Sequence, residues 1–327
     1  MLGMLTVPTL PVVHAFSRTV FEDIDEQAAS LQRWNQRYEQ LSAGRFSGEV
    51  CQLALDGVAL FIEDLHQSVH QTGCVNDDVL AFGVPLLFDS EVRFSGQRGT
   101  GSDLHVFSGR EGFEFHSPKR HVMLCIEVQR SLFDALCSDA TNTAVQAKTK
   151  QSQLLRIEDQ ALGNLRSFAL GLFKAHTRSG PAAVCGPSQT QTRDELLDRL
   201  LAVLVSTDRA APWQTGNVMH LERTARELVM SRLDDPPTVA ELCVALGVSR
   251  RTLQSCFHAT WDMGPLVWLN TMRLNAVRRR LKTAQSVTDA STDFGFWHFG
   301  HFSSNYHSLF GELPSATLSK SRRGRLA

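Results

Sequence analysis

The chain has 327 residues, of which 43% are hydrophobic and 20% charged, and its formal net charge is −1 at pH 7. This composition is ordinary for a folded globular protein and excludes a wholly disordered chain, and the length favours two folded parts. No apolar run is long enough to span a membrane, and the apolar N-terminal segment has no basic residues of the kind that begin a signal peptide. We therefore expect a cytoplasmic protein without membrane contact.

The seven cysteines are scattered, and no two of them have the C-x-x-C spacing of zinc-binding or redox pairs. We expect reduced thiols, no metal and no cofactor. Charge is divided unevenly along the chain. From Leu221 onward there are 14 basic and 9 acidic residues, whereas the preceding 220 residues have 19 basic and 25 acidic ones. The basic C-terminal part is the one suited to contact a polyanion.

The first 41 residues contain two kinds of segment. Residues 1–24 are expected to form a poorly ordered or loosely docked arm. A helix is expected over about 26–41, because Leu31, Trp34 and Tyr38 recur at three- and four-residue spacing.

From residue 48 to 128, short runs of β-forming residues alternate with Gly, Asp, Asn and Ser, about every ten residues. This spacing favours a β-sandwich or a cupin-like barrel over βαβ units. Helical patterns follow over 131–136, 154–176 and 192–206, and residues 207–220 have the composition of a linker. The expected fold is α+β, with a β-rich N-terminal domain over 25–206 that also contains helices.

An internal duplication dominates the C-terminal part. TVAELCVALGV (238–248) is repeated 48 residues later as SVTDASTDFGF (286–296). In each copy a hydroxyl residue and an acid three positions later can cap a helix start, and a glycine can take the positive φ of a sharp turn. These residues are Thr238, Glu241 and Gly247 in the first copy, and Ser286, Asp289 and Gly295 in the second.

A second apolar helix follows each glycine. The matching positions of the two copies are Leu253 and Phe302, Phe257 and Tyr306, Trp261 and Phe310, and Pro265 and Pro314. Helix, glycine turn and second helix make the helix-turn-helix pattern. One copy alone is equally compatible with a helical hairpin in a bundle. Two copies joined by an amphipathic helix over about 266–281 favour DNA binding.

Residues 222–320 resemble the AraC/XylS family of transcription regulators. The stretches that carry the resemblance are TVAELCVALGVSRRTLQSCFHATWDMGPLVWLNTMRLNAVRRRL and DFGFWHFGHFSSNYHSLFGELPSATL. The resemblance implies an all-α domain over 221–320 with two helix-turn-helix units, whose recognition helices enter adjacent segments of the major groove. It implies double-stranded DNA and RNA polymerase as partners, and activation as the regulatory effect.

The first recognition helix is expected to run from Ser249 to about Ala259, with Leu253 and Phe257 facing inward. Arginine can read guanine and glutamine can read adenine in the major groove. The resemblance implies base contacts by Arg251, Gln254 and Ser255. For Arg250 a phosphate contact is equally plausible, and a solvated surface charge is the alternative for either arginine. The DNA-binding candidates of this unit are Ser249, Arg250, Arg251, Gln254 and Ser255.

The second recognition helix, expected over about 298–309, contains no Lys or Arg. We expect this unit to bind weakly and to tolerate sequence variation. The candidates expected to face outward are His298, His301, Ser304 and Asn305, together with His307. The resemblance adds Phe299 and Gly300 as candidates. A zinc site at the histidines is an alternative, disfavoured because no further ligand accompanies them.

Further basic residues lie outside the two recognition helices. The resemblance implies that Arg273 helps to join the two units. The run 278–280 is expected to face phosphates or solvent, rather than bases. Residues 321–327 form a basic tail that either attracts phosphates or is a disordered end.

In AraC/XylS regulators the DNA-binding domain is usually joined to an effector-sensing and dimerisation domain, here residues 25–206. The stretches LQRWNQRYEQLSAGRFSGEV and TGCVNDDVLAFGVP are similar to the ethanolamine-operon regulator subgroup. An amine effector such as ethanolamine requires a carboxylate and aromatic walls. The candidates are Phe82, Phe107, Phe113 and Glu114, with Phe88, Phe94 and Glu111 as further options; packing in the core is the alternative for the phenylalanines.

Two questions about this N-terminal domain stay open. Helices 154–176 and 192–206 can pair between the subunits of a homodimer or pack on the β-rich segment. Histidines at 66, 70, 105, 116 and 121 suggest a cupin-like metal site, but the H-x-H…E…H arrangement of metal cupins is missing. A cupin-like enzyme with an appended DNA-binding module is the alternative function. It is disfavoured because no nucleophile elbow, phosphate loop or metal signature is present.

Overall fold

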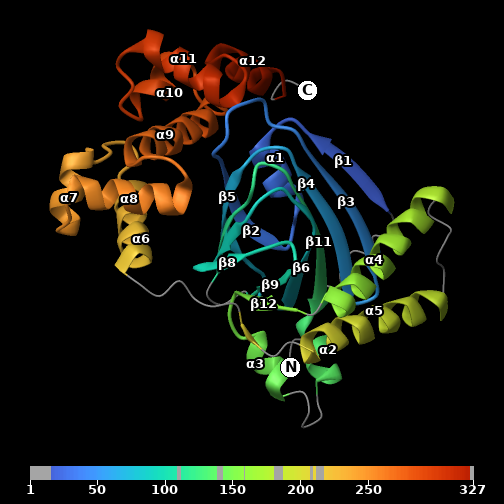
Figure 1. Cartoon of the computed structure of the whole chain (residues 1–327). Coiled ribbons are helices and arrows are strands. Elements are labelled where there is room, and N and C mark those ends of the chain that lie inside the picture. Colours follow the sequence, from blue (N-terminus) through green and yellow to red (C-terminus); the bar gives the residue numbers. More distant parts are fainter. Residues whose placement is uncertain are drawn as a thin grey trace, which may run out of the picture.

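The computed structural model describes residues 16–108, 112–137, 143–157, 159–179, 187–206, 209–210 and 217–324. It contains a β-rich N-terminal part with flanking helices, followed by an all-helical C-terminal part (Figure 1). The predicted α+β fold class is confirmed. The boundaries of the predicted domains stay predictions.

Two antiparallel sheets form the N-terminal part. The large sheet has the strand order β1-β3-β4-β11-β6-β9-β12-β13, and the small sheet has the order β2-β5-β10-β7-β8. The strands of the large sheet are β1 (Ser17–Phe21), β3 (Gly48–Leu55), β4 (Val58–Leu65), β6 (Val79–Phe88), β9 (Asp103–Phe107), β11 (His121–Gln129), β12 (Gln153–Arg156) and β13 (Arg209–Ala210). Those of the small sheet are β2 (Trp34–Gln40), β5 (Val69–Val75), β7 (Val92–Phe94), β8 (Gln97–Gly99) and β10 (Phe113–His116).

The two sheets pack face to face over an aromatic layer. Because side chains alternate along a strand, Phe107 of β9 and Met123 of β11 point toward the small sheet, where Trp34, Phe94 and Phe113 meet them. The ring centroids of Phe107 and Phe113 are 4.9 Å apart in an edge-on arrangement. This layer makes the N-terminal part a closed sandwich with a packed interior.

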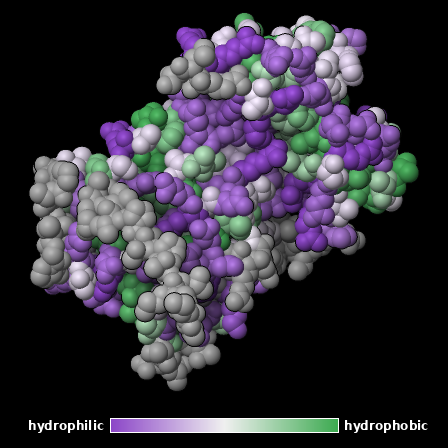
Figure 2. Space-filling view, turned by 180° about the vertical axis from the view of Figure 1, so that it is seen from behind, coloured by the Kyte–Doolittle hydropathy of each residue, from purple (hydrophilic) through white to green (hydrophobic). Residues whose placement is uncertain are grey.

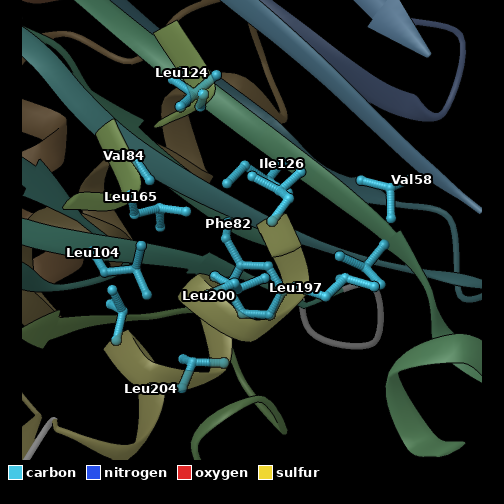
Figure 3. Close-up of a cluster of buried hydrophobic side chains, with 14 of the residues drawn as sticks. Val58, Phe82, Val84, Leu104, Leu124, Ile126, Leu165, Leu197, Leu200 and Leu204 are labelled. Carbon is cyan, nitrogen blue, oxygen red and sulfur yellow. The ribbon is translucent and has the colours of Figure 1, made fainter. Parts of the chain in front are cut away.

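The opposite face of the large sheet is covered by helices (Figures 1 and 3). Phe82, Leu124 and Ile126 of the sheet pack against Leu165 and Leu200 of the two long helices. The helices of this layer are α2 (Arg130–Leu136), α3 (Thr143–Lys148), α4 (Asp159–Ser179) and α5 (Pro187–Val205). The apolar faces of α4 and α5 are buried within the chain. Of the two alternatives given for these helices, this is packing on the β-rich segment and not pairing with a second subunit.

The structure differs from the predicted elements at three places near the N-terminus and before α4. The predicted helix over 26–41 is only α1 (Ile24–Ser30), and residues 34–40 form β2. Side chains four residues apart, such as Trp34 and Tyr38, share a face of a strand as well as of a helix, so their spacing did not separate the two.

The predicted arm is wrong for residues 17–21, which pair with β3 as an edge strand, while residues 1–15 lie outside the described residues. The helix predicted from residue 154 begins at Asp159, because residues 153–156 pair with β9. In both places an isolated short strand carries too few residues for its alternation to be read.

The C-terminal part consists of two small helical cores joined by a long helix. One core contains Leu242, Leu253 and Trp268, and the other contains Phe302 and Tyr306. The helices are α6 (Asn217–Met230), α7 (Val239–Leu246), α8 (Arg250–Trp261), α9 (Pro265–Leu281), α10 (Val287–Thr292), α11 (Phe299–Phe310) and α12 (Pro314–Gly324). Of the predicted linker 207–220, residues 207–208 and 211–216 lie outside the described residues, and α6 begins at Asn217. Residues 321–324 of the predicted tail complete α12, and residues 325–327 are not described.

One face of the molecule is mostly hydrophilic, with hydrophobic residues in small separate patches (Figure 2). Within the described ranges, the helices are too short or too polar to cross a bilayer.

Candidate nucleic-acid interface

The first helix-turn-helix unit is α7, a glycine turn and α8. The Thr238 hydroxyl accepts a hydrogen bond from the Glu241 backbone N–H at 3.2 Å, and the Glu241 carboxylate accepts one from the Thr238 N–H at 2.7 Å. This capping box satisfies two backbone donors at the start of α7. Gly247 ends the helix with a φ of 64°, in the left-handed region that favours glycine. The local roles predicted for these three residues are confirmed.

Helix α8 has a buried side and an exposed side. Leu253, Phe257 and Trp261 are buried in the core of the unit. Ser249 caps the helix by accepting a hydrogen bond from the Thr252 N–H at 3.1 Å, so its hydroxyl already has a structural role. The exposed side presents the remaining candidates, Arg250, Arg251, Gln254 and Ser255. These four side chains share the N-terminal half of the helix, the half that enters the major groove in helix-turn-helix proteins.

The second unit is attached to α9 through Arg273. Its Nε and Nη2 atoms donate to the Phe294 carbonyl at 2.9 and 2.7 Å, and its guanidinium group lies 4.1 Å from the centroid of the Phe296 ring. Gly295 has a φ of 72°, and a Cβ there would lie 3.0 Å from Arg273 Nη2. Glycine therefore allows both the turn and the close approach of the arginine. The implied role of Arg273 in joining the two units agrees with these contacts.

Helix α11 also divides into two sides. Phe302, Tyr306 and Phe310 are buried and hold the helix on its core. The candidates are all exposed, namely His298, Phe299, Gly300, His301, Ser304 and Asn305. Trp297, which was not a candidate, is exposed at the same end of the helix. The signal that could have identified it is its position directly before the helix start.

The basic run 278–280 does not face DNA as a unit. Arg279 Nη2 lies 2.5 Å from both carboxylate oxygens of Glu39, and Arg278 Nη2 lies 3.3 Å from Asp23 Oδ2. Lys282 pairs with Asp23 and with Asp25. We call Asp23, Asp25 and Glu39 the acidic cluster. Although burial raises the pKa of Asp23, Lys282 and Arg278 lower it below its ordinary value.

The prediction that this run faces phosphates or solvent is therefore wrong for Arg278 and Arg279. Only Arg280 is exposed, where it pairs with Asp293 at 2.7 Å. The error has a physical cause: the acidic partners are about 240 residues or more away in sequence, and α1 and β2 bring them to α9.

The same face of α9 contacts the backbone of β2. Asn275 accepts a hydrogen bond from the Gln40 N–H and donates one to the Gln40 carbonyl, both at 2.9 Å. The Gln40 side-chain amide donates to the Leu309 carbonyl of α11 at 2.8 Å. Gly44 N–H donates to the same carbonyl at 3.0 Å. The N-terminal part thus contacts the central helix and the second unit together.

A buried polar cluster connects the N-terminal part to the first unit. His70 Nε2 lies 2.9 Å from Glu114 Oε1, and Arg226 Nη2 of α6 donates to Glu114 Oε2 at 2.7 Å. Glu222 accepts from Arg226 Nε at 3.2 Å and from Trp261 Nε1 at 3.1 Å. We call these five residues the interface cluster. In this cluster Arg226 pairs with two carboxylates, those of Glu114 and Glu222.

The two carboxylates of the interface cluster titrate in opposite directions. Burial and the charge of Glu114 raise the pKa of Glu222 to about 7, against the opposing effect of Arg226. Burial also acts to raise the pKa of Glu114, but the hydrogen bond with His70 and the charge of Arg226 lower it below its ordinary value. One proton on Glu222 near neutral pH relieves the repulsion between the two acids.

Of the four effector candidates, the structure brings only Phe107 and Phe113 into ring contact, and Phe82 lies in a different core. Phe82 lies in the core beneath α4 and α5, against Phe133. Phe107 and Phe113 pack in the aromatic layer between the sheets. Glu114 belongs to the interface cluster, where His70 and Arg226 already occupy its oxygens. Of the further options, Phe88 and Phe94 pack around His105, and Glu111 lies outside the described residues.

His66 is at the surface beside Asp64, and the other four histidines of the β-rich part have two kinds of surroundings. His105 and His121 are enclosed in the sandwich, and burial lowers the pKa of each to about 3. His70 and His116 contact Trp261 at the interface, with ring centroids 4.8 and 5.2 Å away. No group of three or more His, Cys, Asp or Glu suited to a metal occurs among the described residues.

A cavity of about 420 Å³ opens between the N-terminal part and the C-terminal end of α8. Arg93, Arg98 and Lys119 line it from the β-rich part, and Trp261 and Asp262 line it from the end of α8. Arg93 also donates a hydrogen bond to the Ala259 carbonyl of α8. A molecule bound in this cavity would contact both parts of the chain.

Comparison with known proteins finds a family model that matches residues of the C-terminal part. Residues 242–320 match the model of a helix-turn-helix domain. The XylDLEGF operon transcriptional activator 1 of Pseudomonas putida is 34% identical over 154 residues, which cover 44% of this chain and 42% of that protein. The transcriptional activator NphR of a Rhodococcus species is 34% identical over 122 residues, which cover 37% of this chain and 35% of that protein.

The crystal structure of the AraC-like transcriptional activator CuxR matches with a TM-score of 0.43 and 14% identity, over 85% of this chain and 100% of that one. The chain spans less than half the length of the XylDLEGF operon activator and of NphR. Residues 242–320 are similar to a helix-turn-helix domain, and over parts of 154 and 122 residues the chain is similar to transcriptional activators.

Proposed function

We propose that the chain is a DNA-binding transcription regulator of the AraC/XylS type, which reads two adjacent major-groove segments through α8 and α11. One observation carries the proposal. On a matched helix-turn-helix scaffold, the N-terminal half of α8 exposes hydrogen-bonding side chains, while the large apolar side chains Leu253, Phe257 and Trp261 are buried in the core. That is the arrangement of a recognition helix.

The exposed side chains of α8 differ in what they can read. Arg251 and Gln254 have the donor and acceptor geometry to read guanine and adenine, respectively. Arg250 lies in the first turn, where a guanidinium group can bind a backbone phosphate. Arg251 and Gln254 are therefore proposed to carry specificity, and Arg250 to carry affinity that falls with added salt.

The test is selection of binding sites from random DNA with the full-length protein, followed by affinity measurement. Arg251→Ala is expected to lower the affinity for the selected site by about five- to 150-fold and to relax the preference for one base pair. Arg223→Ala, an exposed arginine of α6 outside the two helix-turn-helix units, is the matched control and should bind as the parent does. Failure to enrich any sequence, or equal affinity of the Arg251 variant, would count against the proposal.

Regulation by a small molecule belongs to the same proposal. An effector bound in the cavity between the parts would alter the contacts of the β-rich part with α8. The XylDLEGF operon transcriptional activator 1 is named for a different operon. The ethanolamine-operon resemblance stays a prediction. Thermal unfolding with ethanolamine, cobalamins, other amines and organic acids can test it, because a ligand at 100 times its Kd stabilises a protein by about 2.7 kcal/mol.

The remaining partners follow from this function. Contact with RNA polymerase, activation of transcription, a homodimeric state and a cytoplasmic location are proposed for the chain. The alternative of a cupin-like enzyme has no support from the relatives named above, which are transcriptional activators.

A further inference from the structure

Two exposed aromatic side chains stand at the start of the second recognition helix. Trp297 is 69% exposed and Phe299 is 44% exposed. Among the Phe, Trp and Tyr residues in the described ranges, they are the only exposed ones. They lie on either side of His298, the N-cap of α11. Aromatic side chains with this much surface are the ones most often buried on contact with a partner.

The turn that carries Trp297 is fixed on its inner side. Arg273 holds the Phe294 carbonyl and covers the ring of Phe296, and Phe296 in turn contacts Phe302, with ring centroids 5.2 Å apart. Phe294 and Phe296 of this segment already pack against the core of the second unit. Trp297 and Phe299 therefore project from an ordered base, at the end of α11 that a recognition helix inserts into the groove.

The chemistry of α11 restricts what this end can read. The helix has no Lys or Arg, so it lacks the side chains that bind guanine bidentately. In the major groove the apolar group that base pairs display is the C5-methyl group of thymine. Aromatic side chains at the inserted end match that group, just as arginine matches guanine.

We propose that Trp297 and Phe299 contact thymine methyl groups, so that the second unit selects T·A base pairs by apolar contact whereas the first unit uses hydrogen bonds. This inference rests on the proposed function. It also changes the expectation for the second half-site. An absence of Lys and Arg predicts weak hydrogen-bond readout, but apolar contacts give the unit a base preference of its own.

The surroundings of the two aromatic residues favour DNA over a protein partner. His298 lies between them, and His301, Ser304 and Asn305 continue the exposed side along α11. A protein-binding patch has an apolar centre within a polar rim, whereas here His298 separates the two aromatic residues in the sequence, and exposed hydrogen-bonding groups follow along α11. That alternation fits a groove, in which methyl groups and base-edge acceptors lie side by side.

The test uses the full-length protein and the site that it selects from random DNA. Thymines are replaced by deoxyuridine in one half-site at a time, which removes the C5-methyl group and leaves the hydrogen-bonding edge unchanged. In one half-site the affinity should fall about fourfold for each methyl group that the protein buries, the ratio expected for one apolar carbon. The same substitutions are then measured with Trp297→Ala and with the double variant Trp297→Ala/Phe299→Ala.

The expected result is that the double variant binds the thymine and deoxyuridine forms of that half-site equally. Leu313→Ala, an exposed apolar residue of the same unit after α11, is the matched control and should keep the full methyl dependence. The inference is overturned if deoxyuridine changes affinity less than twofold in both half-sites, or if the double variant keeps the methyl dependence.

A third result identifies a different partner and also overturns the inference: the double variant binds DNA unchanged, yet no longer activates transcription. Failure to select any site is distinct from all of these results, because it removes the proposed function itself.

Discussion

Glu222 is a buried carboxyl group whose protonation depends on the packing of the two parts. Its pKa is raised from 4.5 to about 7 in the folded chain by burial and by Glu114. A raised folded-state pKa means that the folded form binds the proton more tightly than the unfolded form does. The contribution to stability is therefore fully present below about pH 4.5 and is lost as the pH rises through 7.

We predict that Glu222→Gln reduces this loss of stability. Glutamine mimics the protonated acid and keeps an oxygen that can accept from Trp261 Nε1. The free energy of unfolding of the variant should therefore exceed that of the parent by on the order of 1–3 kcal/mol at pH 8. At pH 5 the two should be nearly equal. Urea unfolding of the full-length protein at both pH values measures the difference. Glu227→Gln, an exposed neighbour on α6, is the control. An equal difference between parent and variant at the two pH values would contradict the prediction.

Individual residues were predictable from the sequence where their role is local. The capping hydroxyls, the turn glycines and the exposed side of α8 depend on neighbours within a few positions. Arg278, Arg279 and Glu114 were not predictable, because their partners come from distant segments. Their charges are compensated within the chain, which no pattern in the sequence indicates.

Helix α9 is the element on which the arrangement of the second unit depends. It contacts the acidic cluster through its last turns, the backbone of β2 through Asn275, and the second unit through Arg273. Two adjacent arginines on this helix have opposite surroundings. Arg279 pairs with Glu39, which is 3% exposed, whereas Arg280 pairs with Asp293 at the surface.

We predict that Arg279→Ala destabilises the chain by about 1–3 kcal/mol, because it removes a partner of a buried carboxylate while Arg37 still pairs with it. Arg280→Ala should have a much smaller effect, since exposed ion pairs contribute little. Chemical denaturation of the two variants side by side measures the contrast. Equal effects of the two variants would contradict the prediction.

At the scale of elements, long periodic segments were predicted well and short ones were not. The helices of the duplicated pattern and the long α4 and α5 were found because several turns repeat the same apolar spacing. Strand β2 was mistaken for a helix, because its buried aromatic residues Trp34 and Tyr38 are four apart. Strands β1 and β12 each depend on a neighbouring strand for their hydrogen bonds, and that neighbour is not visible in the local sequence.

For the whole molecule, the contacts of α9 predict a rigid separation between the two recognition helices. An α-helix of 17 residues is about 25 Å long, and both of its ends are bound to other elements. DNA with five extra base pairs between the half-sites should therefore lose at least about tenfold in affinity, since the second site is turned to the opposite side of the duplex.

Ten extra base pairs should not restore the affinity, because rigid units cannot span the added helical turn. Electrophoretic mobility shifts with the parent and the two longer sites measure this, and a site with both half-sites mutated sets the non-specific level. Recovery with ten base pairs would show that the two units move apart freely.

The α+β class and the two helix-turn-helix units were predictable at this scale, because periodicity and duplication reveal them. The packing of the β-rich part on α9 was not. It rests on single polar residues, such as Gln40 and Asn275, which are 235 positions apart.

The pairing of Asn275 with Gln40 has a consequence for self-association. Strand β2 is at the edge of the small sheet, where a neighbouring strand could add to its free backbone groups. Asn275 occupies the N–H and the carbonyl of Gln40 as a partner strand would, so α9 covers the end of that edge. Any variant or ligand that separates the two parts also exposes the unpaired backbone groups at the end of β2. Release of the DNA-binding part would therefore increase the tendency of the β-rich part to aggregate.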